Sequence, residues 1–220
     1  MSINIFTDAS ITKTIHGETV GCAGAICLEN DNICKFEIQR DSTNNISELT
    51  AVRLAIELGL KNRPKDNLIN VWADSQWAIF GLTKWNRSWL NNIYNNILIS
   101  SSGQPVKNQH LFLSIMKMIV DNRIRVNFYH IKGHVNTNDI GSVSNAVSVF
   151  KNSNNATISR DKMYIVAKMN NMVDKQTRDL LKGVKNEPRV YLTRGIINPI
   201  LAKEDLITYY NLVTLGSNPI

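Results

Sequence analysis

Short apolar runs predict five strands along the chain. They are rich in Ile, Val, Phe and Cys and are bounded by polar turns, as strands are. The first three follow one another through short connections, which predicts a three-stranded antiparallel start. The predicted strands are residues 3–10, 19–29, 34–40, 68–75 and 124–131.

Apolar residues three and four positions apart predict helices between and after these strands. In the first helix Leu49, Val52 and Ile56 recur at this spacing, and Pro64 forbids continuation. Ser, Gly and Pro indicate a loop at 99–108. The predicted helices are residues 47–60, 76–97, 110–122, 143–150 and 163–180, followed by a strand-like segment at 189–193 and a helical one at 201–213.

This order of elements predicts an α/β fold. Three antiparallel strands followed by two parallel additions imply a mixed five-stranded sheet flanked by helices. Parallel neighbours require crossover helices, so the strand that ends at Asp8 and the one that ends at Asp74 can lie side by side. Both carboxylates would then emerge at the same end of the sheet, where open α/β sheets place their sites.

Glu48 occupies a position at which the first helix should bury apolar residues. It lies four residues before Val52 and seven before Ala55, so it shares their stripe. A buried, unpaired carboxylate is costly, so this position predicts a partner. The sheet end that carries Asp8 and Asp74 is within reach of this helix.

Three carboxylates that meet at one point repel one another at neutral pH, and hard divalent cations relieve the repulsion. Mg²⁺ or Mn²⁺ suits oxygen ligands, and two such ions about 4 Å apart can clamp the attacking and leaving oxygens of a phosphoryl displacement. A fourth carboxylate, Asp174, follows Val173 inside an apolar-periodic helix. Each acid alone is better explained as a surface or capping residue, whereas their joint placement favours a metal site.

Positive charge is concentrated in one part of the chain. Residues 83–134 carry 7 basic side chains against the single Asp121, whereas residues 1–82 carry 7 basic and 10 acidic ones. The net charge of the chain is +7. A basic segment beside an acidic cluster predicts a polyanionic ligand, and a solvated basic surface is the alternative.

The composition is that of an ordinary globular protein, with 43% hydrophobic residues, and 220 residues suffice for one well-packed domain. No apolar run approaches a membrane span, and the N-terminus lacks a signal-peptide pattern. Cys22, Cys27 and Cys34 form no C-x-x-C pair, which argues against zinc. We expect reduced thiols and a cytoplasmic monomer that has no organic cofactor and no contact with membranes.

Seven short motifs, from residue 3 to about residue 182, resemble type 1 ribonuclease H in their order: FTDAS, TNNISEL, ADSQWAIFGL, TKW, PVKN, KGH and NNMVD. The resemblance implies a ribonuclease H-like fold and endonucleolytic hydrolysis of the RNA strand of an RNA–DNA hybrid. Two Mg²⁺ ions would activate water, leaving 5′-phosphate and 3′-hydroxyl ends. By the same resemblance, the metal ions are bound by Asp8, Glu48, Asp74 and Asp174.

The resemblance also implies substrate contacts. Asn45 resembles the asparagine that reads minor-groove edges of the hybrid, and Gln76 resembles its glutamine partner. Thr43 matches a position that holds a DNA-strand phosphate, and Asn44 lies between the two TNN contacts. Such contacts make chemical sense, because 2′-hydroxyls in a wide minor groove distinguish RNA from DNA. Capping of the helix is a compatible role for Thr43 and Asn45.

Residues 81–108 resemble the basic protrusion that some family members use to grip the hybrid. Packing within the protein is the favoured role of its tryptophans. The residues predicted to make up the gripping surface of this protrusion are Lys84, Trp85, Arg87, Trp89 and Lys107.

His134 resembles the family's loop histidine, which assists proton transfer or product release. An imidazole that titrates near neutrality suits that task. His130 lies four positions earlier, about 13 Å away along a strand, so a structural role is predicted for it rather than a zinc pair.

Three parts of the chain depart from the family pattern. The first hairpin lacks its usual glycines, and two further segments have no counterpart in the pattern. Residues 136–168 are predicted to be a helical insertion, because His134 and Asp174 are 40 positions apart. Residues 183–220 form an extension of unknown role, which leaves 1–182 as the catalytic domain.

Other functions explain part of the sequence. A DNA-acting nuclease of the integrase or resolvase type would share the acidic cluster, but it would not need the TNN and DSQ motifs or the protrusion. A non-catalytic hybrid-binding module would not need all four acids. Recruitment of nucleic acid by charge alone leaves Glu48 unexplained.

Overall fold

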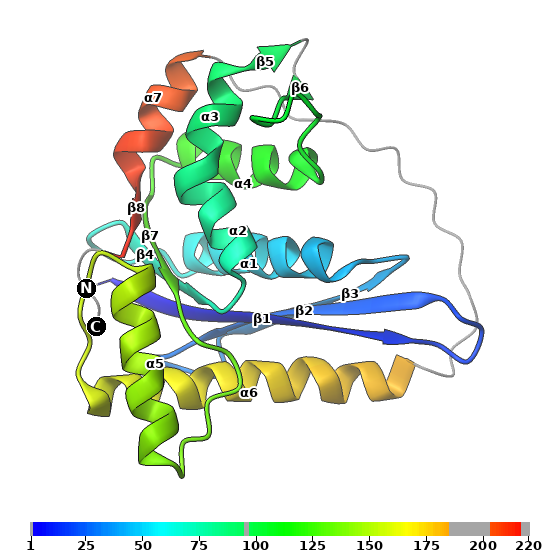
Figure 1. Cartoon of the computed structure of the whole chain (residues 1–220), viewed down its shortest axis with the longest axis vertical. Coiled ribbons are helices and arrows are strands. Elements are labelled where there is room, and N and C mark those ends of the chain that lie inside the picture. Colours follow the sequence, from blue (N-terminus) through cyan, green and yellow to red (C-terminus); the bar gives the residue numbers. More distant parts are fainter. Residues whose placement is uncertain (1, 95–96, 185–202, 217–220) are drawn as a thin grey trace.

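The computed structural model describes residues 2–94, 97–184 and 203–216. Its centre is a six-stranded sheet of order β3-β2-β1-β4-β7-β8, in which β4, β7 and β8 join β1 in parallel (Figure 1). The five predicted strands are confirmed, and β8 is an addition that the sequence did not predict. The strands of this sheet are β1 (Ile3–Lys13), β2 (Thr19–Cys27), β3 (Cys34–Arg40), β4 (Leu68–Ala73), β7 (Arg125–His130) and β8 (Val213–Leu215).

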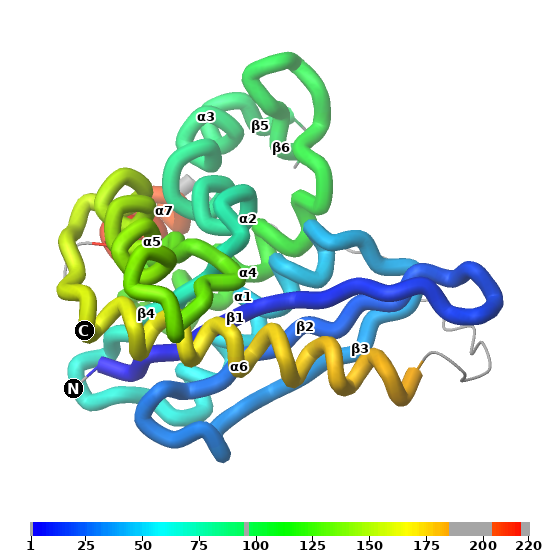
Figure 2. The backbone as a smooth tube through the Cα atoms, turned by 60° about the horizontal axis from the view of Figure 1, so that its bottom comes forward, coloured from blue at the N-terminus to red at the C-terminus, as the bar shows by residue number. Residues whose placement is uncertain are grey.

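Helices cover both faces of this sheet. One layer contains α1 (Asn44–Lys61) and α4 (Gln109–Asp121), and the other contains α5 (Ile140–Ser153) and α6 (Arg160–Val184). Figure 2 shows α6 running along β1 and β2 on the side away from α1. No helix among the described residues is long and apolar enough to cross a membrane.

A row of amides crosses the sheet on the face that α5 and α6 cover. Asn70 donates to Asn4 Oδ1 over 3.0 Å, Asn127 donates to Asn70 Oδ1 over 2.9 Å, and the Thr214 hydroxyl donates to Asn127 Oδ1. Asn4 in turn donates to Glu29 over 2.7 Å. Because these buried amides are hydrogen-bonded to one another, the sheet avoids most of the cost of burying them.

A row of aromatic rings comes next on the same face, two residues further along each strand. Phe6, Trp72 and Tyr129 stack with ring centroids 5.5 Å and 4.1 Å apart, and Phe150 of α5 packs against them. A further step of two residues reaches Asp8 on β1, while on β4 it reaches the residue just past the strand end. The strand register therefore aligns the two acids in a third row.

The prediction of one helix over 76–97 is wrong. The segment forms α2 (Gln76–Phe80), a π-helical turn η1 (Gly81–Trp85) and α3 (Asn86–Asn91), and then a hairpin of β5 (Ile93–Tyr94) and β6 (Ile97–Leu98). Asparagine side chains compete with the helical pattern by bonding to main-chain carbonyls. Asn86 donates to the Leu82 carbonyl over 2.7 Å, and Asn92 donates to the Ser88 carbonyl as α3 ends.

The C-terminal segment packs on this part of the chain. Its predicted helix is present as α7 (Lys203–Leu212) and leads directly into β8, whereas the strand-like segment 189–193 lies outside the described residues. Tyr209 is fully buried, and its hydroxyl donates to the Leu82 carbonyl over 2.7 Å. The segment therefore holds the base of the protrusion (residues 81–108).

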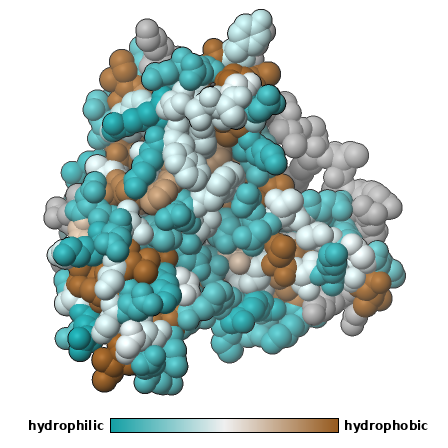
Figure 3. Space-filling view, in the orientation of Figure 1, coloured by the Kyte–Doolittle hydropathy of each residue, from teal (hydrophilic) through white to brown (hydrophobic). Residues whose placement is uncertain are grey.

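The predicted insertion (residues 136–168) packs on the sheet through apolar side chains and is also hydrogen-bonded to it through one asparagine side chain. Asn154, just after α5, accepts a 3.0 Å bond from the His130 amide and donates a 2.7 Å bond to the His130 carbonyl. This side chain thus provides hydrogen-bond partners for both main-chain groups of His130, the last residue of β7, near the point where β8 ends. Hydrophobic residues gather on the outer surface over α5 (Figure 3), including Ile140, which is 70% exposed.

Tyr209 substitutions measure how much the C-terminal segment contributes to stability. Tyr209→Phe should lower the free energy of unfolding by about 1 kcal/mol, because one hydrogen bond is lost while Leu82 O keeps its bond from Asn86. Tyr209→Ala should lower it by about 3–5 kcal/mol, because it also empties a large buried volume. Urea titrations with both variants check this, and equal small losses would mean that the segment is only loosely attached.

Candidate active site

Parallel pairing of β1 with β4 places two carboxylates together. Thr7 is in register with Ala73 on the adjacent strand. The residues that follow them, Asp8 and Asp74, are therefore neighbours across the β1–β4 pair. Asp8 is buried and Asp74 is partly buried. The two acids therefore lie side by side, as predicted, at the end of the β1–β4 pairing. The prediction that the first strand ends at Asp8 is wrong, because β1 continues to Lys13 in its pairing with β2.

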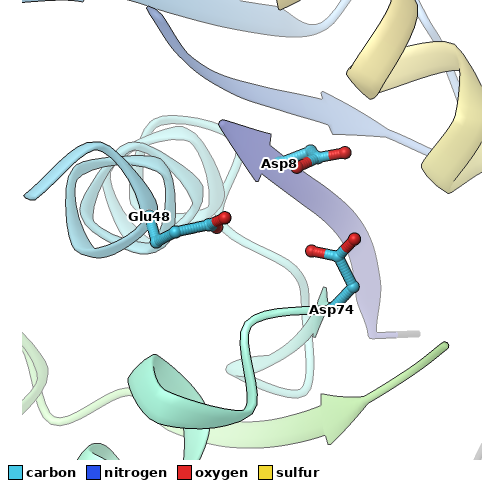
Figure 4. A group of neighbouring side chains, drawn as sticks. All are labelled: Asp8, Glu48 and Asp74. Carbon is cyan, nitrogen blue, oxygen red and sulfur yellow. The ribbon is translucent and has the colours of Figure 1, made fainter. Parts of the chain in front are cut away.

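Glu48 approaches the pair from α1. Thr43 caps this helix by accepting a hydrogen bond from the Ile46 amide, and α1 presents Glu48 one turn later. Figure 4 shows the three side chains converging from the helix, the strand and the strand end. One oxygen of each carboxylate lies within 4.8 Å of the other two.

Burial and crowding make these carboxylates unfavourable as bare anions. Burial, together with the charge of Asp74, raises the pKa of Asp8 to about 8. Burial and the charges of Asp74 and Asp8 raise the pKa of Glu48 well above its usual value, and burial raises the pKa of Asp74. Asp8 Oδ2 is buried and has no hydrogen-bond partner among the described residues. Oxygen ligands that repel one another and leave a buried oxygen unsatisfied fit a hard divalent cation.

Asp174 borders this group from α6, on the face of the sheet opposite α1. It is buried and close enough to raise the pKa of Asp8, but it is not among the three carboxylates that converge. Its Oδ2 accepts a 2.6 Å bond from Arg178, one turn further along α6, and lies 3.5 Å from His134 Nδ1. The fourth acid and the loop histidine therefore lie next to each other despite the insertion between them.

Comparisons with known proteins agree with this geometry. A sequence model of the RNase H family matches residues 1–141. The chain belongs to the RNase H family. Ribonuclease HI of Haemophilus influenzae is 33% identical over 132 residues, which are 60% of this chain and 78% of the relative. A ribonuclease H of Clostridium botulinum is 32% identical over 133 residues, 59% of this chain and 82% of that protein.

The fold comparison gives the same result. A foamy viral protease-reverse transcriptase, solved in complex with double-stranded DNA, has a TM-score of 0.50 at 14% identity, over 69% of this chain and 92% of that chain. The family match and the sequence relatives make the protein a ribonuclease H hydrolase, and the solved structure agrees with the mixed sheet of that fold. The matched residues include Asp8, Glu48, Asp74 and His134 but end before Asp174, so the position of the fourth acid depends on the structure alone.

Four of the predicted substrate residues of this ribonuclease H lie on accessible surface at the start of α1 and of α2. Thr43, Asn44 and Asn45 are exposed at the start of α1, and Gln76 is exposed as the first residue of α2. Capping of α1 by Thr43 is confirmed. Further away, the protrusion carries its predicted residues on the outside, except that Trp89 is buried against Phe112; the exposed ones are Lys84, Trp85, Arg87 and Lys107.

Two histidines have different environments. His134 has a positive φ of 53° and lies in an accessible loop, and Asn171 of α6 holds that loop through a 2.8 Å bond to the Val135 carbonyl. His130 is buried, and burial lowers the pKa of its imidazole. Its main chain is bound by Asn154, consistent with the structural role predicted for it.

Three neighbours of the acids escaped the sequence analysis. Asn170 is buried and donates to Asp74 Oδ2 over 3.5 Å, and Arg178 pairs with Asp174. A side chain at Gly133 would place its Cβ 2.3 Å from Asp74 Oδ2, so only glycine lets the loop pass this acid. The signal for Asn170 and Arg178 was their spacing, since each lies four residues from Asp174 on one face of a helix.

Glu48→Gln should stabilise the metal-free protein while removing a carboxylate. Because the pKa of Glu48 is raised in the folded state, its ionisation disfavours folding. The same holds for Asp8: its protonated form stabilises the folded state at low pH, and this contribution to the free energy of unfolding is lost as pH rises from about 4 to about 8. In chelator at pH 8 the variant should melt at least about 2–4 °C above wild type, and the gap should close below pH 4.

Thermal melts between pH 4 and pH 8 test this expectation. Glu57→Gln is the matched control on the same helix, because it removes a carboxylate that pairs with Lys35 and Arg53 and should therefore not stabilise the protein. If Glu48→Gln melts no higher than wild type at pH 8, ionisation of Glu48 does not destabilise the folded protein, and the expectation is wrong.

Proposed function

We propose that this ribonuclease H is an endonuclease that cleaves the RNA strand of RNA–DNA hybrids and leaves 5′-phosphate and 3′-hydroxyl ends. The observation that carries the proposal is the convergence of Asp8, Glu48 and Asp74 at the sheet end, each with a raised pKa. A bare cluster of this kind is unfavourable, so it favours a role in which divalent cations balance its charge.

The proposed metal ligands are Asp8, Glu48 and Asp74, with Asp174 as the fourth carboxylate. Two Mg²⁺ ions, for which Mn²⁺ can substitute, would supply an activated water and stabilise the leaving oxygen. Asn170 holds Asp74 in place through its side-chain amide. Asp174 must share its oxygens between the metal site and Arg178.

Recognition of the hybrid is assigned to the exposed residues around α1 and to the protrusion. Asn45 and Gln76 are assigned to the minor-groove edges, with Asn44 as a further substrate contact, and Thr43 to a phosphate while it caps the helix; all four are exposed. Lys84, Trp85, Arg87 and Lys107 would hold the backbone, a contact that weakens with salt.

His134 is proposed to move a proton during product formation or release. It is exposed, lies on a loop and is adjacent to Asp174, which places an imidazole at the edge of the acid cluster. His134→Ala should lower kcat about 10²-fold and leave KM nearly unchanged. Steady-state kinetics on one hybrid check this, and a change confined to KM would contradict the assignment.

Asp74→Asn tests the reaction itself. Wild type in Mg²⁺ should cut only the RNA strand of a labelled hybrid and should leave duplex DNA, duplex RNA and chelator-treated samples intact. Asp74→Asn nearly preserves shape while it removes a ligand charge, so kcat should fall about 10³-fold or more with little change in hybrid binding. Cleavage of duplex DNA by wild type would favour a DNA-acting nuclease, and binding without cleavage in either metal would favour a non-catalytic module.

A further inference from the structure

A pocket of about 550 Å³ lies where the protrusion, the insertion and the C-terminal segment meet. The lining residues that come from the insertion and from the C-terminal segment lie beyond residues 1–141, which the family model matches. Its lining comprises Thr83, Lys84 and Arg87 from η1 and α3, Asn155 from the α5–α6 connection, and Tyr210 with strand β8 from the C-terminal segment.

The pocket is positively charged. No acidic residue lines it, and neither Lys84 nor Arg87 forms an ion pair with an acid within the described ranges. Instead, aromatic rings hold the two cations: Lys84 Nζ lies 3.8 Å from the centre of the Phe80 ring, and the Arg87 guanidinium lies 5.4 Å from that of Tyr210. Cations held in this way keep their charge available to a ligand.

Other groups at the pocket complement a phosphate ester. Asn155 offers an exposed amide, and among the described residues β8 is an edge strand, whose outer amide groups have no neighbouring strand there. Val213 and Leu215 add apolar surface beside these donors. Cations and amides next to an apolar wall suit a nucleotide unit, and the volume is within the range of small-molecule sites.

We propose that this pocket binds one nucleotide unit through its phosphate, at a place separate from the carboxylate cluster. The sheet order β1-β4-β7-β8 puts it two or three strands from the acids, roughly 10–15 Å away. At roughly 3.4 Å per nucleotide this is three or four steps along a strand. The nucleotide is either part of a duplex bound across the active site, in which case the inference rests on the proposed function, or a free mononucleotide.

Asn155→Asp tests the proposal on the side of the pocket that the α5–α6 connection forms, away from the protrusion. The change is isosteric and places a negative charge in the lining. Asn152→Asp is the matched control, since it adds the same charge on an exposed residue of α5 that does not line the pocket. A second pair compares Arg87→Gln with Lys65→Gln, which removes a charge from the turn before β4, at the other end of that strand from Asp74.

Binding is measured in chelator, so that no turnover occurs, by fluorescence anisotropy with duplexes that carry one ribonucleotide block. The DNA flank is lengthened on one side or on the other. The Kd of wild type should fall once one flank is long enough to reach the pocket. For such duplexes, Asn155→Asp and Arg87→Gln should each raise the Kd about tenfold. The salt dependence of binding should also weaken by about one phosphate contact, with both controls unchanged.

Calorimetric titration with adenosine monophosphate and with inorganic phosphate separates the two sources. Binding of free nucleotide that Asn155→Asp abolishes, without any flank dependence, supports the site with a mononucleotide as its ligand. Asn155→Asp and Arg87→Gln that match their controls in every assay would overturn the proposal. Because none of these assays needs cleavage, failure of the proposed function would appear separately, as a wild type that binds but never cuts.

Discussion

Parallel pairing between β1 and β4 is the contact on which the rest of this structure depends. It aligns three rows of side chains across one face of the sheet: amides, then aromatic rings, then carboxylates. The amide row fixes the register, because a slip of one residue would leave Asn4 and Asn70 without each other and turn the rings to the wrong face. The same register therefore sets the distance between Asp8 and Asp74.

The carboxylate row is unfavourable to folding, and the surrounding structure offsets that cost. The aromatic row next to the acids and the helical layers on both faces of the sheet supply buried apolar surface. Asn170 and Arg178, both on α6, donate side-chain hydrogen bonds to Asp74 and Asp174, and the Ala9 amide donates to Asp8. Stability and activity thus make opposite demands on Glu48 and Asp8.

The sequence predicted the site better than its surroundings. Asp8 and Asp74 could be placed because each ends an apolar run, and Glu48 because a carboxylate on an apolar stripe has few explanations. Trp85 and Trp89 carried a helical spacing, but the π-turn at η1 and the asparagine bonds that end α3 depend on local competition that periodicity does not record. Strand β8 has three residues, and its partner Asn127 lies 87 positions away from Thr214, so no local pattern could reveal it.

That long separation has a consequence for how the molecule is assembled. Until β8 arrives, β7 is the edge of the sheet, Asn127 lacks the hydroxyl of its partner, and Leu82 lacks Tyr209. Contacts between distant parts of a chain close late, because the intervening segment must first be ordered. The three converging carboxylates belong to β1, α1 and β4 or the residue after it, all within the first 74 residues, so they are synthesised long before β8. A nascent chain would then contain all three converging carboxylates before the C-terminal side of the basic pocket exists, so the two sites would be completed one after the other.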